Sequence, residues 1–494
     1  MKKCFVYPSL KIRFLAVVSL LIAAVACLSS TADVQKPFEP TPESLKQYKC
    51  PEWFRDAKFG IYLHWGVYSV AEFGEWYARN MYMEGSPEYK HHVEKYGHPS
   101  KFGYKDFIPM WKAEKFDPDR LVALFKKAGA KYFTPCAVHH DNFDLWNSKY
   151  HKWNSVNMGP KKDITAMWRE AALKYGLRFG ATTHLERSYS WFQVNKGADK
   201  SGPYAGVPYD GADANYRDFY HDPTADTNMK HPKNPPVHWR KEWAMRIMDL
   251  IDNYKLDFLY FDGAVPFQGD DNGKTGFKVI AHLYNQSMKW HNGRQEAVMT
   301  IKKFKDHGIY VDGIATQDME RKRAGAMMDE PWQTDTSIGP WGYHAGAKYR
   351  TVDQIVDEMI DIVSKNGNML LNVPPKADGT LDGETEKVLL GIGRWFDING
   401  EAIYGTRPWI KYGDEKLRFT HKGDTLYVIS LEWPGDGQTL EVPAADLGDM
   451  AGKVKDVTLL GHNGKLQWKQ DESGLTITMP GKAPCENAYS FKVL

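Results

Sequence analysis

The chain has 494 residues, too many for one ordinary domain and enough for a barrel-sized unit with a smaller companion. Its 64 Lys and Arg residues nearly balance 62 Asp and Glu residues, so charge favours neither nucleic acid nor a membrane surface as a partner. The 17 Trp residues suit sugar binding, because the apolar faces of a sugar ring stack on aromatic side chains, and they suit a large core equally well.

The N-terminal segment has the layout of a secretory signal peptide, assigned here to residues 1–26. Four basic residues among the first 13 precede an apolar run at 14–26 that is short for a membrane span. Ala24-Val25-Ala26 fits a signal-peptidase site, whereas Ala26 followed by Cys27 resembles a bacterial lipobox. Both alternatives stay open, and they predict either a periplasmic or outer-membrane lipoprotein with a lipid anchor at Cys27, or a secreted protein.

Apart from Cys4 in this segment and Cys27 at its end, the chain has three cysteines, Cys50, Cys136 and Cys485. They are scattered, and no CxxC pair or other metal-binding spacing occurs among them. We therefore expect the stability of the chain to depend on neither disulfides nor zinc.

After a polar lead-in that ends near residue 47, apolar strand-like runs alternate with amphipathic helical stretches. The helical stripe is clearest at 119–130 and 351–365. Several of the strand-like runs are continuously apolar, as expected for strands covered on both faces. These runs lie at 59–64, 131–140, 177–186, 256–263, 297–301, 313–320 and 368–373. The alternation predicts an α/β fold with a (β/α)8-like barrel of the TIM type, regular or irregular, over residues 34–400.

From about residue 406 the pattern changes to short runs separated by turn signals such as Gly435-Asp436-Gly437 and His462-Asn463-Gly464. The runs lie at 426–431, 454–460, 466–468, 475–479 and 489–493. We predict a C-terminal antiparallel β-sandwich over residues 406–494, packed on the barrel. Support of the barrel is favoured over carbohydrate binding as its role.

Polar residues close several of the barrel runs, at the end where barrel enzymes carry their active sites. These residues are His64, His139-His140-Asp141, His184-Leu185-Glu186, Asp262-Gly263 and Asp318-Met319-Glu320. The sequence therefore predicts a polar cavity at the C-terminal ends of the strands.

The same residues also have ordinary structural interpretations. Asp262 is as compatible with the N-cap of a following helix as with a carboxylate aimed at a sugar, and an isolated His64 is more often a core histidine. Adjacent residues on a strand point to opposite faces, so we do not expect His139 and His140 to share a metal ion. No metal site and no cofactor is predicted.

Several longer motifs resemble the α-L-fucosidases, glycoside hydrolase family 29. They occur in the family's order and cover about residues 53–399. The motifs are Trp53 to Gly66, Gly74-Glu75-Trp76-Tyr77, Ala128 to Tyr132 with His139 to Trp146, Phe261-Asp262-Gly263, Pro331 to Ile338 with Trp341-Gly342-Tyr343, and Asn366 to Val373.

This resemblance implies a retaining exo-α-L-fucosidase that hydrolyses terminal α-L-fucosyl residues of glycans by double displacement. Asp262 matches the family's nucleophile. Glu320 is the predicted acid/base, because its distance from the nucleophile resembles one bacterial branch, and Glu330 is the alternative. The residues expected to contact the sugar are His64, Glu75, Trp76, His139, His140 and His184, with Tyr260 and Trp332 as an aromatic wall.

Two segments depart from the family's pattern and leave the exact sugar open. Many members have Tyr-Tyr-Ser where this chain has Thr183 to Arg187, and many have an arginine where it has Lys302, Lys303 and Lys305. The alternatives are an α-L-galactosidase or related α-L-glycosidase, a metal-dependent hydrolase, and a non-catalytic carbohydrate-binding protein. The expected partner is an oligosaccharide or glycoconjugate with a terminal α-L-sugar, and nucleic acid is not expected.

Overall fold

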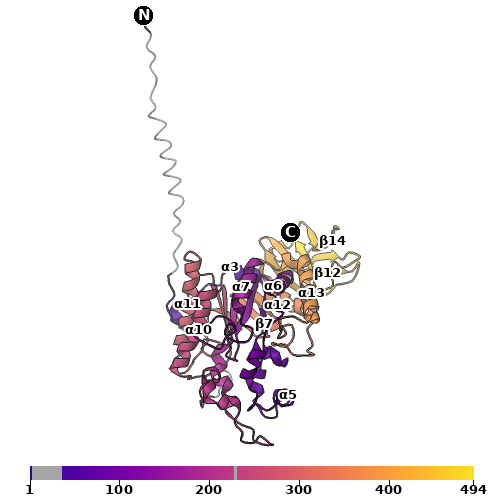
Figure 1. Ribbon diagram of the computed structural model, residues 1–494. Helices are drawn as coiled ribbons and strands as arrows, with labels where there is room; N and C mark the ends of the chain where they lie inside the picture. The colour runs from indigo at the N-terminus through magenta and orange to yellow at the C-terminus, as the bar shows by residue number, and fades with distance from the viewer. Residues whose placement is uncertain (3–35, 227–230) are drawn as a thin grey trace.

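The computed structural model describes residues 1–2, 36–226 and 231–494 (Figure 1). Most of the predicted signal peptide, including its cleavage alternatives, lies outside these residues, and so does Cys27. Within the described part of the chain, no helix is long and apolar enough to cross a membrane.

Eight parallel strands close into a barrel in chain order, which confirms the predicted fold class. Strand β8 closes the barrel on β1, where Gly60 lies opposite Leu370. The strands are β1 (Phe59–Leu63), β2 (Tyr132–Val138), β3 (Arg178–Thr183), β4 (Phe258–Phe261), β5 (Val298–Lys302), β6 (Thr316–Asp318), β7 (Trp332–Ser337) and β8 (Gly367–Asn372).

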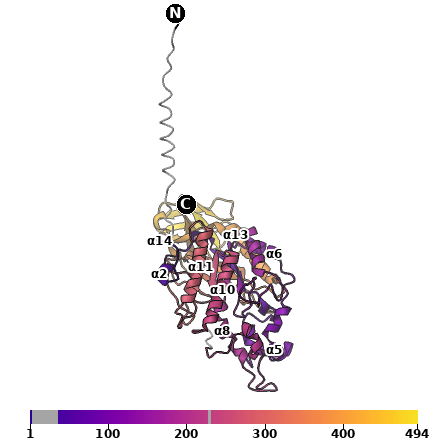
Figure 2. The ribbon, with the colours of Figure 1, turned by 60° about the vertical axis from the view of Figure 1, so that its left-hand side comes forward.

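Amphipathic helices cover the barrel, and Figure 2 shows α10 and α11 side by side on one flank. Helix α6 illustrates the local cause: the Asp117 side chain caps it, Pro118 begins it, and Leu121, Val122 and Phe125 bury one stripe. The long helices are α6 (Pro118–Lys127), α7 (Ile164–Lys174), α10 (Val237–Tyr254), α11 (Lys274–Trp290), α12 (Val352–Ser364) and α13 (Gly383–Asn399). The short ones are α2 (Pro42–Leu45), α3 (Glu52–Ala57), α4 (Tyr77–Asn80), α5 (Pro87–Tyr96), α8 (Ser188–Trp191) and α9 (Arg217–Tyr220).

The barrel is irregular on the side of β5, β6 and β7. Residues 303–315 and 319–331, all of which the structure describes, connect these strands without a helix. Strand β7 is also the barrel strand that the apolar pattern does not predict, because five of its six buried residues are polar. Two long loops therefore lie beside the strand ends on this side.

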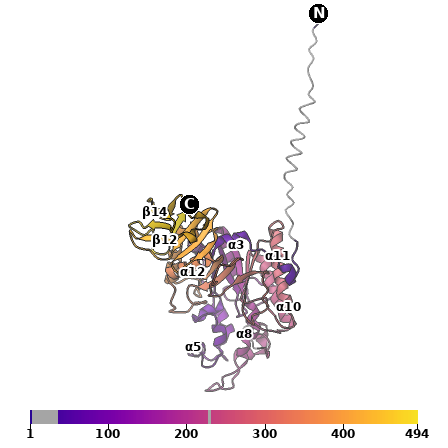
Figure 3. The same ribbon diagram turned by 180° about the vertical axis from the view of Figure 1, so that it is seen from behind.

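The C-terminal region forms two antiparallel sheets, as predicted, with strand orders β13-β16-β11-β10-β9 and β12-β15-β14. Figure 3 shows these sheets next to α12, and the Trp395 indole on α13 donates to the Ala488 carbonyl at 3.0 Å. The strands are β9 (Arg407–Gly413), β10 (Leu417–Lys422), β11 (Thr425–Ser430), β12 (Thr439–Pro443), β13 (Val457–Leu459), β14 (Gln467–Asp471), β15 (Gly474–Thr478) and β16 (Tyr489–Val493), with α14 (Ala444–Leu447) between β12 and β13.

Candidate active site

A polar cavity of about 220 Å³ lies at the C-terminal ends of the barrel strands. Sites for drug-sized ligands usually measure about 300–1,000 Å³, so this cavity suits a single sugar ring better than a longer chain. Its lining consists of Tyr62, His64, Glu75, Trp76, His139, His140, His184, Arg187, Tyr260, Asp262, Lys302, His307, Glu320, Asp335 and Trp341. The structure thus brings together nine of the residues predicted from sequence, including Asp262 and Glu320.

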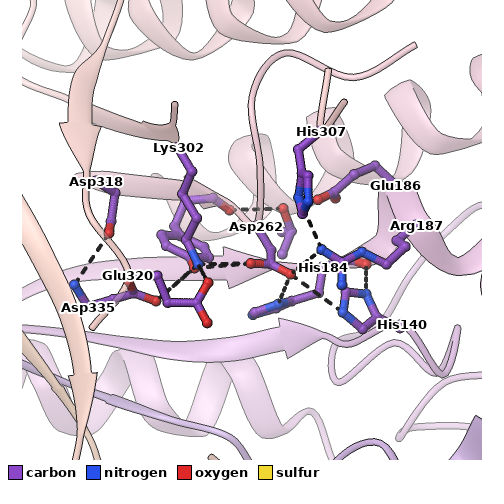
Figure 4. A network of polar contacts seen from close by, with 12 residues as sticks. His140, His184, Glu186, Arg187, Asp262, Lys302, His307, Asp318, Glu320 and Asp335 are labelled. Atoms are coloured by element: carbon purple, nitrogen blue, oxygen red, sulfur yellow. Dashed lines mark hydrogen bonds and ion pairs between the residues drawn. The ribbon is translucent and has the colours of Figure 1, made fainter. Parts of the chain in front are cut away.

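Asp262 is the first residue after β4, and the strand end aims it into the cavity (Figure 4). The next helix, α11, begins after Gly273, so Asp262 is not an N-cap. Gly263 has φ 154°, and a Cβ there would lie 2.5 Å from Nε2 of His231. Only glycine allows the chain to turn away at this point while the Asp262 side chain stays in the cavity.

Four basic groups surround the Asp262 carboxylate. Lys302 Nζ donates to Oδ1 at 3.0 Å, and Oδ2 lies 3.3 Å from Arg187 Nη2. The same oxygen lies 3.4 Å from His184 Nδ1 and 3.5 Å from His140 Nε2 (Figure 4). Burial alone would raise the pKa of Asp262, but the charges of Lys302 and Arg187 hold it well below its usual range. Asp262 is therefore ionised, as a nucleophile must be.

Glu320 shares the ammonium group of Lys302 with Asp262. Lys302 Nζ donates to Glu320 Oε2 at 2.7 Å, so this oxygen and Asp262 Oδ1 lie no more than about 6 Å apart. Burial raises the pKa of Glu320, and the charges of Asp335 and Asp262 add to the rise against the opposing charge of Lys302. The two carboxyl groups are thus shifted in opposite directions, which is how an acid and a nucleophile are distinguished at one pH.

Lys302 is fully buried and also contacts a third carboxylate, Asp335, at 3.3 Å. The hydroxyl groups of Tyr260 and Tyr62 donate to Asp335 Oδ2 at 3.0 and 3.3 Å. Burial alone would lower the pKa of Lys302, but these carboxylates raise it well above its usual range. Lys302 therefore stays charged, and Asp335 fixes it between Asp262 and Glu320.

Four histidines form the opposite side of the cavity. The ring centroid of His139 lies 4.3 Å from that of His140 and 4.8 Å from that of His184. His64 Nδ1 donates to Asn372 Oδ1 at 2.9 Å. Burial lowers the pKa of His64 to about 3, helped by the neighbouring His184. Burial likewise lowers the pKa of His139 and His140, so these rings are neutral and can donate to or accept from sugar hydroxyls.

Comparison with known proteins identifies the family to which the chain belongs. The family model described as α-L-fucosidase matches residues 25–401, and the model of the α-L-fucosidase C-terminal domain matches residues 413–494. The chain belongs to the α-L-fucosidase family, a family of glycoside hydrolases.

Relatives match along most of the chain. Plasma α-L-fucosidase of Homo sapiens is 31% identical over 473 residues, which are 92% of this chain and 92% of the human protein. Tissue α-L-fucosidase of Rattus norvegicus is 30% identical over 492 residues, covering 96% of each chain. The crystal structure of Thermotoga maritima α-fucosidase in complex with fucose is 29% identical, with a TM-score of 0.72 and coverage of 92% of this chain and 100% of that chain.

Two residues predicted for the site of this fucosidase family member lie elsewhere. Trp332 is the first residue of β7, fully buried, and its indole donates to the Lys365 carbonyl at 2.8 Å. With Glu330 it lines a separate cavity of about 430 Å³ near Tyr48. The prediction of a Trp332 wall is wrong, because this residue begins its strand and the sugar cavity lies where strands end. Glu330, in the same separate cavity, is not placed to act as the acid.

The aromatic wall instead combines Tyr260 with Trp341 and Trp76. The Trp341 ring lies 5.4 Å from the His64 ring, between centroids. The Trp341 loop also holds Glu75, whose Oε2 accepts from the Gly342 N–H at 2.9 Å. Trp341 belongs to one of the family motifs found in the sequence, but it was not predicted to line the cavity.

Other lining residues were missed as site residues. Arg187 lies in the 183–187 segment, whose sequence differs from the family pattern, and Lys302 stands where many members of the family have an arginine. Asp335 falls within a recognised motif, whereas nothing in the local sequence of His307 indicates a site. The departures from the family pattern were therefore the best available signal for the two cations that contact Asp262.

A buried carboxyl group lies behind Asp262. Glu186 is fully buried, and its Oε1 lies 3.8 Å from Nε2 of His231, a ring whose Nε2 donates to the Asp262 carbonyl at 3.1 Å. Burial, reinforced by the charge of Asp262, raises the pKa of Glu186 to about 8. Glu186 is thus protonated at neutral pH and adds no negative charge beside Asp262.

The histidines also have the spacing of metal ligands. Among the described residues, His64, His139 and His184 form one such group, and His140, His184 and Asp262 form another, with ligand atoms within 4.8 Å of one another. The argument that His139 and His140 point apart is wrong, because β2 ends at Val138 and both residues lie beyond its pleat. A metal ion in the second group would contact Asp262 directly.

Proposed function

We propose that the protein is a retaining exo-α-L-fucosidase that releases terminal α-L-fucosyl residues from glycans by double displacement. The observation that carries this proposal is the shared contact of Asp262 and Glu320 with Lys302, which brings Asp262 Oδ1 and Glu320 Oε2 within about 6 Å of each other. Retaining glycosidases have carboxyl groups about 5–5.5 Å apart, whereas inverting ones leave about 6.5–9.5 Å for a water molecule. The spacing favours direct attack by Asp262.

In the first step Asp262 attacks C1 of the sugar while Glu320 gives its proton to the leaving oxygen. Bond formation removes the charge of Asp262, and proton transfer creates a charge on Glu320. Lys302 contacts both groups, so the carboxylate charge beside its ammonium is conserved through the step. In the second step Glu320 takes a proton from water, which attacks C1 and releases Asp262.

The neutral imidazoles of His64, His139 and His140 would bind ring hydroxyls, because hydrogen bonds to a neutral sugar need no charge. A substrate that lacks a hydroxyl would leave a buried polar group unpaired and bind less well. The small volume of the cavity supports exo action on one terminal ring. A non-catalytic sugar-binding protein would need neither the ionised Asp262 nor the raised pKa of Glu320.

The decisive experiment offers aryl α-L-fucoside, aryl α-L-galactoside and fucosylated oligosaccharides, with the anomer of the first product followed by NMR. We expect fucoside hydrolysis with α-L-fucose formed first. The β-anomer as first product would replace double displacement by inversion. Faster hydrolysis of the galactoside would identify an α-L-galactosidase, and binding without hydrolysis a carbohydrate-binding protein.

We further propose that the protein is exported, on the strength of the basic and apolar N-terminal segment. Mass spectrometry of the mature N-terminus would separate cleavage after Ala26 alone from cleavage with lipid attached to Cys27. An unprocessed N-terminus in the cytoplasm would contradict export.

A further inference from the structure

In the proposed reaction, the leaving group must pass Glu320, because this residue protonates the oxygen that departs. The Glu320 side chain is 30% exposed, against 12% for Asp262. Glu320 thus faces the mouth of the cavity, and the chain that follows β6 forms that side of the mouth.

Three exposed basic residues, Arg321, Lys322 and Arg323, follow Glu320 directly. The Arg321 guanidinium lies 4.2 Å from the ring centroid of Trp341, a residue of the cavity wall, and its Nη2 donates to the Gly339 carbonyl at 3.2 Å. Arg321 therefore stands on the rim of the sugar cavity.

The backbone at Arg321 is strained in a way that serves this placement. Its φ is 49°, in the left-handed region that residues other than glycine rarely adopt, and its N–H donates to the Asp335 carbonyl at 2.9 Å. Strain of this kind persists where surrounding structure holds it and is concentrated at functional sites. The turn directs Glu320 inward and Arg321 to the rim.

An open cleft of about 840 Å³ continues from Arg321, nearly four times the volume of the sugar cavity. Five Lys or Arg side chains line it against three Asp or Glu side chains. The buried Asp361 serves three of the cations, with Lys365 at 2.9 Å, Arg418 at 2.9 Å and Arg323 at 3.6 Å. With five basic against three acidic side chains, the lining keeps an excess of positive charge.

This excess is local, since the whole chain has 64 basic and 62 acidic residues. The loop after β5 adds to it, because Lys303 and Lys305 are exposed beside Phe304. Lys322 Nζ lies 5.9 Å from the Phe304 ring centroid, so the loop after β5 and the loop after β6 are in contact.

We propose that this basic cleft binds the leaving-group part of an anionic glycan, whose sulfate esters or carboxylates pair with Arg321, Lys322 and Arg323. Guanidinium groups bind such oxyanions through two parallel hydrogen bonds, and lysine adds charge. The inference rests on the proposed function, because only a cleaved glycan places its aglycone past Glu320. It narrows the substrate to a fucosyl residue attached to an acidic chain.

The experiment compares kcat/KM for three disaccharides: α-L-fucosyl-galactose, the same compound with a sulfate ester on galactose, and α-L-fucosyl-galacturonic acid. In about 50 mM NaCl we expect at least one charged compound to exceed the neutral one by about fivefold or more, as a few exposed ion pairs allow. The ratio of kcat/KM for the charged compound to kcat/KM for the neutral compound should fall toward one as NaCl rises to about 0.5 M, because salt screens exposed charges.

The matched variants are Lys322→Gln/Arg323→Gln in the cleft and Lys465→Gln/Lys469→Gln, two exposed lysines just before and within β14. Asp361 keeps Lys365 and Arg418 in the first variant, so the fold should persist, and a melting curve checks this. We expect the charged-to-neutral ratio of kcat/KM to fall about fivefold in the first variant and to stay unchanged in the second.

Equal kcat/KM for all three compounds at low salt, or equal ratios in both variants, would overturn the proposal. This failure is distinct from failure of the proposed function, in which the wild-type protein would hydrolyse neither the neutral disaccharide nor an aryl α-L-fucoside.

Discussion

The two halves of the active site differ in charge and in regularity. The ends of β1, β2 and β3 supply the histidine half, which consists of His64, His139, His140 and His184. The ends of β4 to β7 supply the charged half, which consists of Asp262, Lys302, Glu320 and Asp335. The histidine half stands on strands joined through helices, whereas the charged half includes two loops without any.

In the proposed mechanism, this difference separates sugar binding from bond cleavage at one end of the barrel. Neutral imidazoles suit hydroxyl groups whose charge does not change during the reaction. Carboxylates paired on one buried ammonium suit the point where charge moves between groups. Variants in the charged half should therefore affect turnover more than variants in the histidine half.

The largest effect is expected for Asp262→Ala, which removes the proposed nucleophile. We expect kcat/KM to fall by at least about 10⁴-fold for aryl α-L-fucoside, as when central catalytic groups are removed from other enzymes. Circular dichroism and the melting temperature check that the fold persists. Near-normal hydrolysis of both the fucoside and the galactoside would remove Asp262 from the mechanism.

Glu320→Gln should slow substrates with poor leaving groups by about 10²–10⁴-fold and activated aryl fucosides much less, because only poor leaving groups need protonation. Azide should restore turnover of Glu320→Ala with activated substrates. The matched control is Glu330→Gln, in the separate cavity, which should keep wild-type kinetics. Equal slowing of all substrates without azide rescue would exclude Glu320 as the acid.

Lys302→Gln tests whether the shared ammonium links the two carboxyl groups. Lys302 lowers the pKa of Asp262, so its removal should raise that pKa and move the acidic limb of the pH profile of kcat/KM to higher pH. We expect turnover to fall by about 10²-fold, with partial recovery in Lys302→Arg. An unchanged acidic limb in Lys302→Gln would show that the other neighbours suffice to keep Asp262 ionised.

Variants in the histidine half should change the pH dependence of stability more than they change turnover. The pKa of His64 is about 3 in the folded protein, so the unfolded chain binds this proton first as pH falls. The contribution of His64 to stability is therefore present above pH ~6.5 and is lost progressively as pH falls toward 3.

Melting temperatures measured between pH 7 and pH 4 check this expectation. The decline should be smaller in His64→Gln, which cannot take up a proton, than in the wild-type protein. His421, a half-buried histidine on β10, provides the control variant His421→Gln, whose decline should match the wild type. Equal declines in all three proteins would show that His64 does not couple pH to folding.

The histidine half was also the half that the sequence predicted well. Its residues follow apolar runs, and an apolar run marks both the strand and the point where it ends. The prediction that His139 and His140 point to opposite faces was wrong. The rule of alternating faces holds within a strand, and both residues lie beyond the last residue of β2.

The charged half was predicted less completely, and one cause is that polar residues build β7. In β7, Gln333 accepts a hydrogen bond from Tyr132 at 3.1 Å and Asp335 accepts one from Tyr260 at 3.0 Å, so side-chain bonds take the place of apolar burial. Hydrophobic periodicity cannot detect such a strand. Because the boundaries of β7 were not predicted, the family motif alone could not show that Trp332 begins this strand and that Trp341 lies beyond its end.

The smallest effect is expected from chelation, which asks whether the histidine half binds hydroxyl groups or a metal ion. Two groups of ligand atoms have metal-like spacing, and neutral imidazoles are the form that binds metals. A Zn²⁺ ion on His64, His139 and His184 would compete with the sugar instead of assisting the carboxylates. We therefore expect kcat/KM to be unchanged by prolonged dialysis against EDTA and added Zn²⁺ to inhibit competitively. Loss of activity on dialysis that a metal restores would show that the histidine half binds a catalytic metal ion. This outcome would favour the metal-dependent hydrolase.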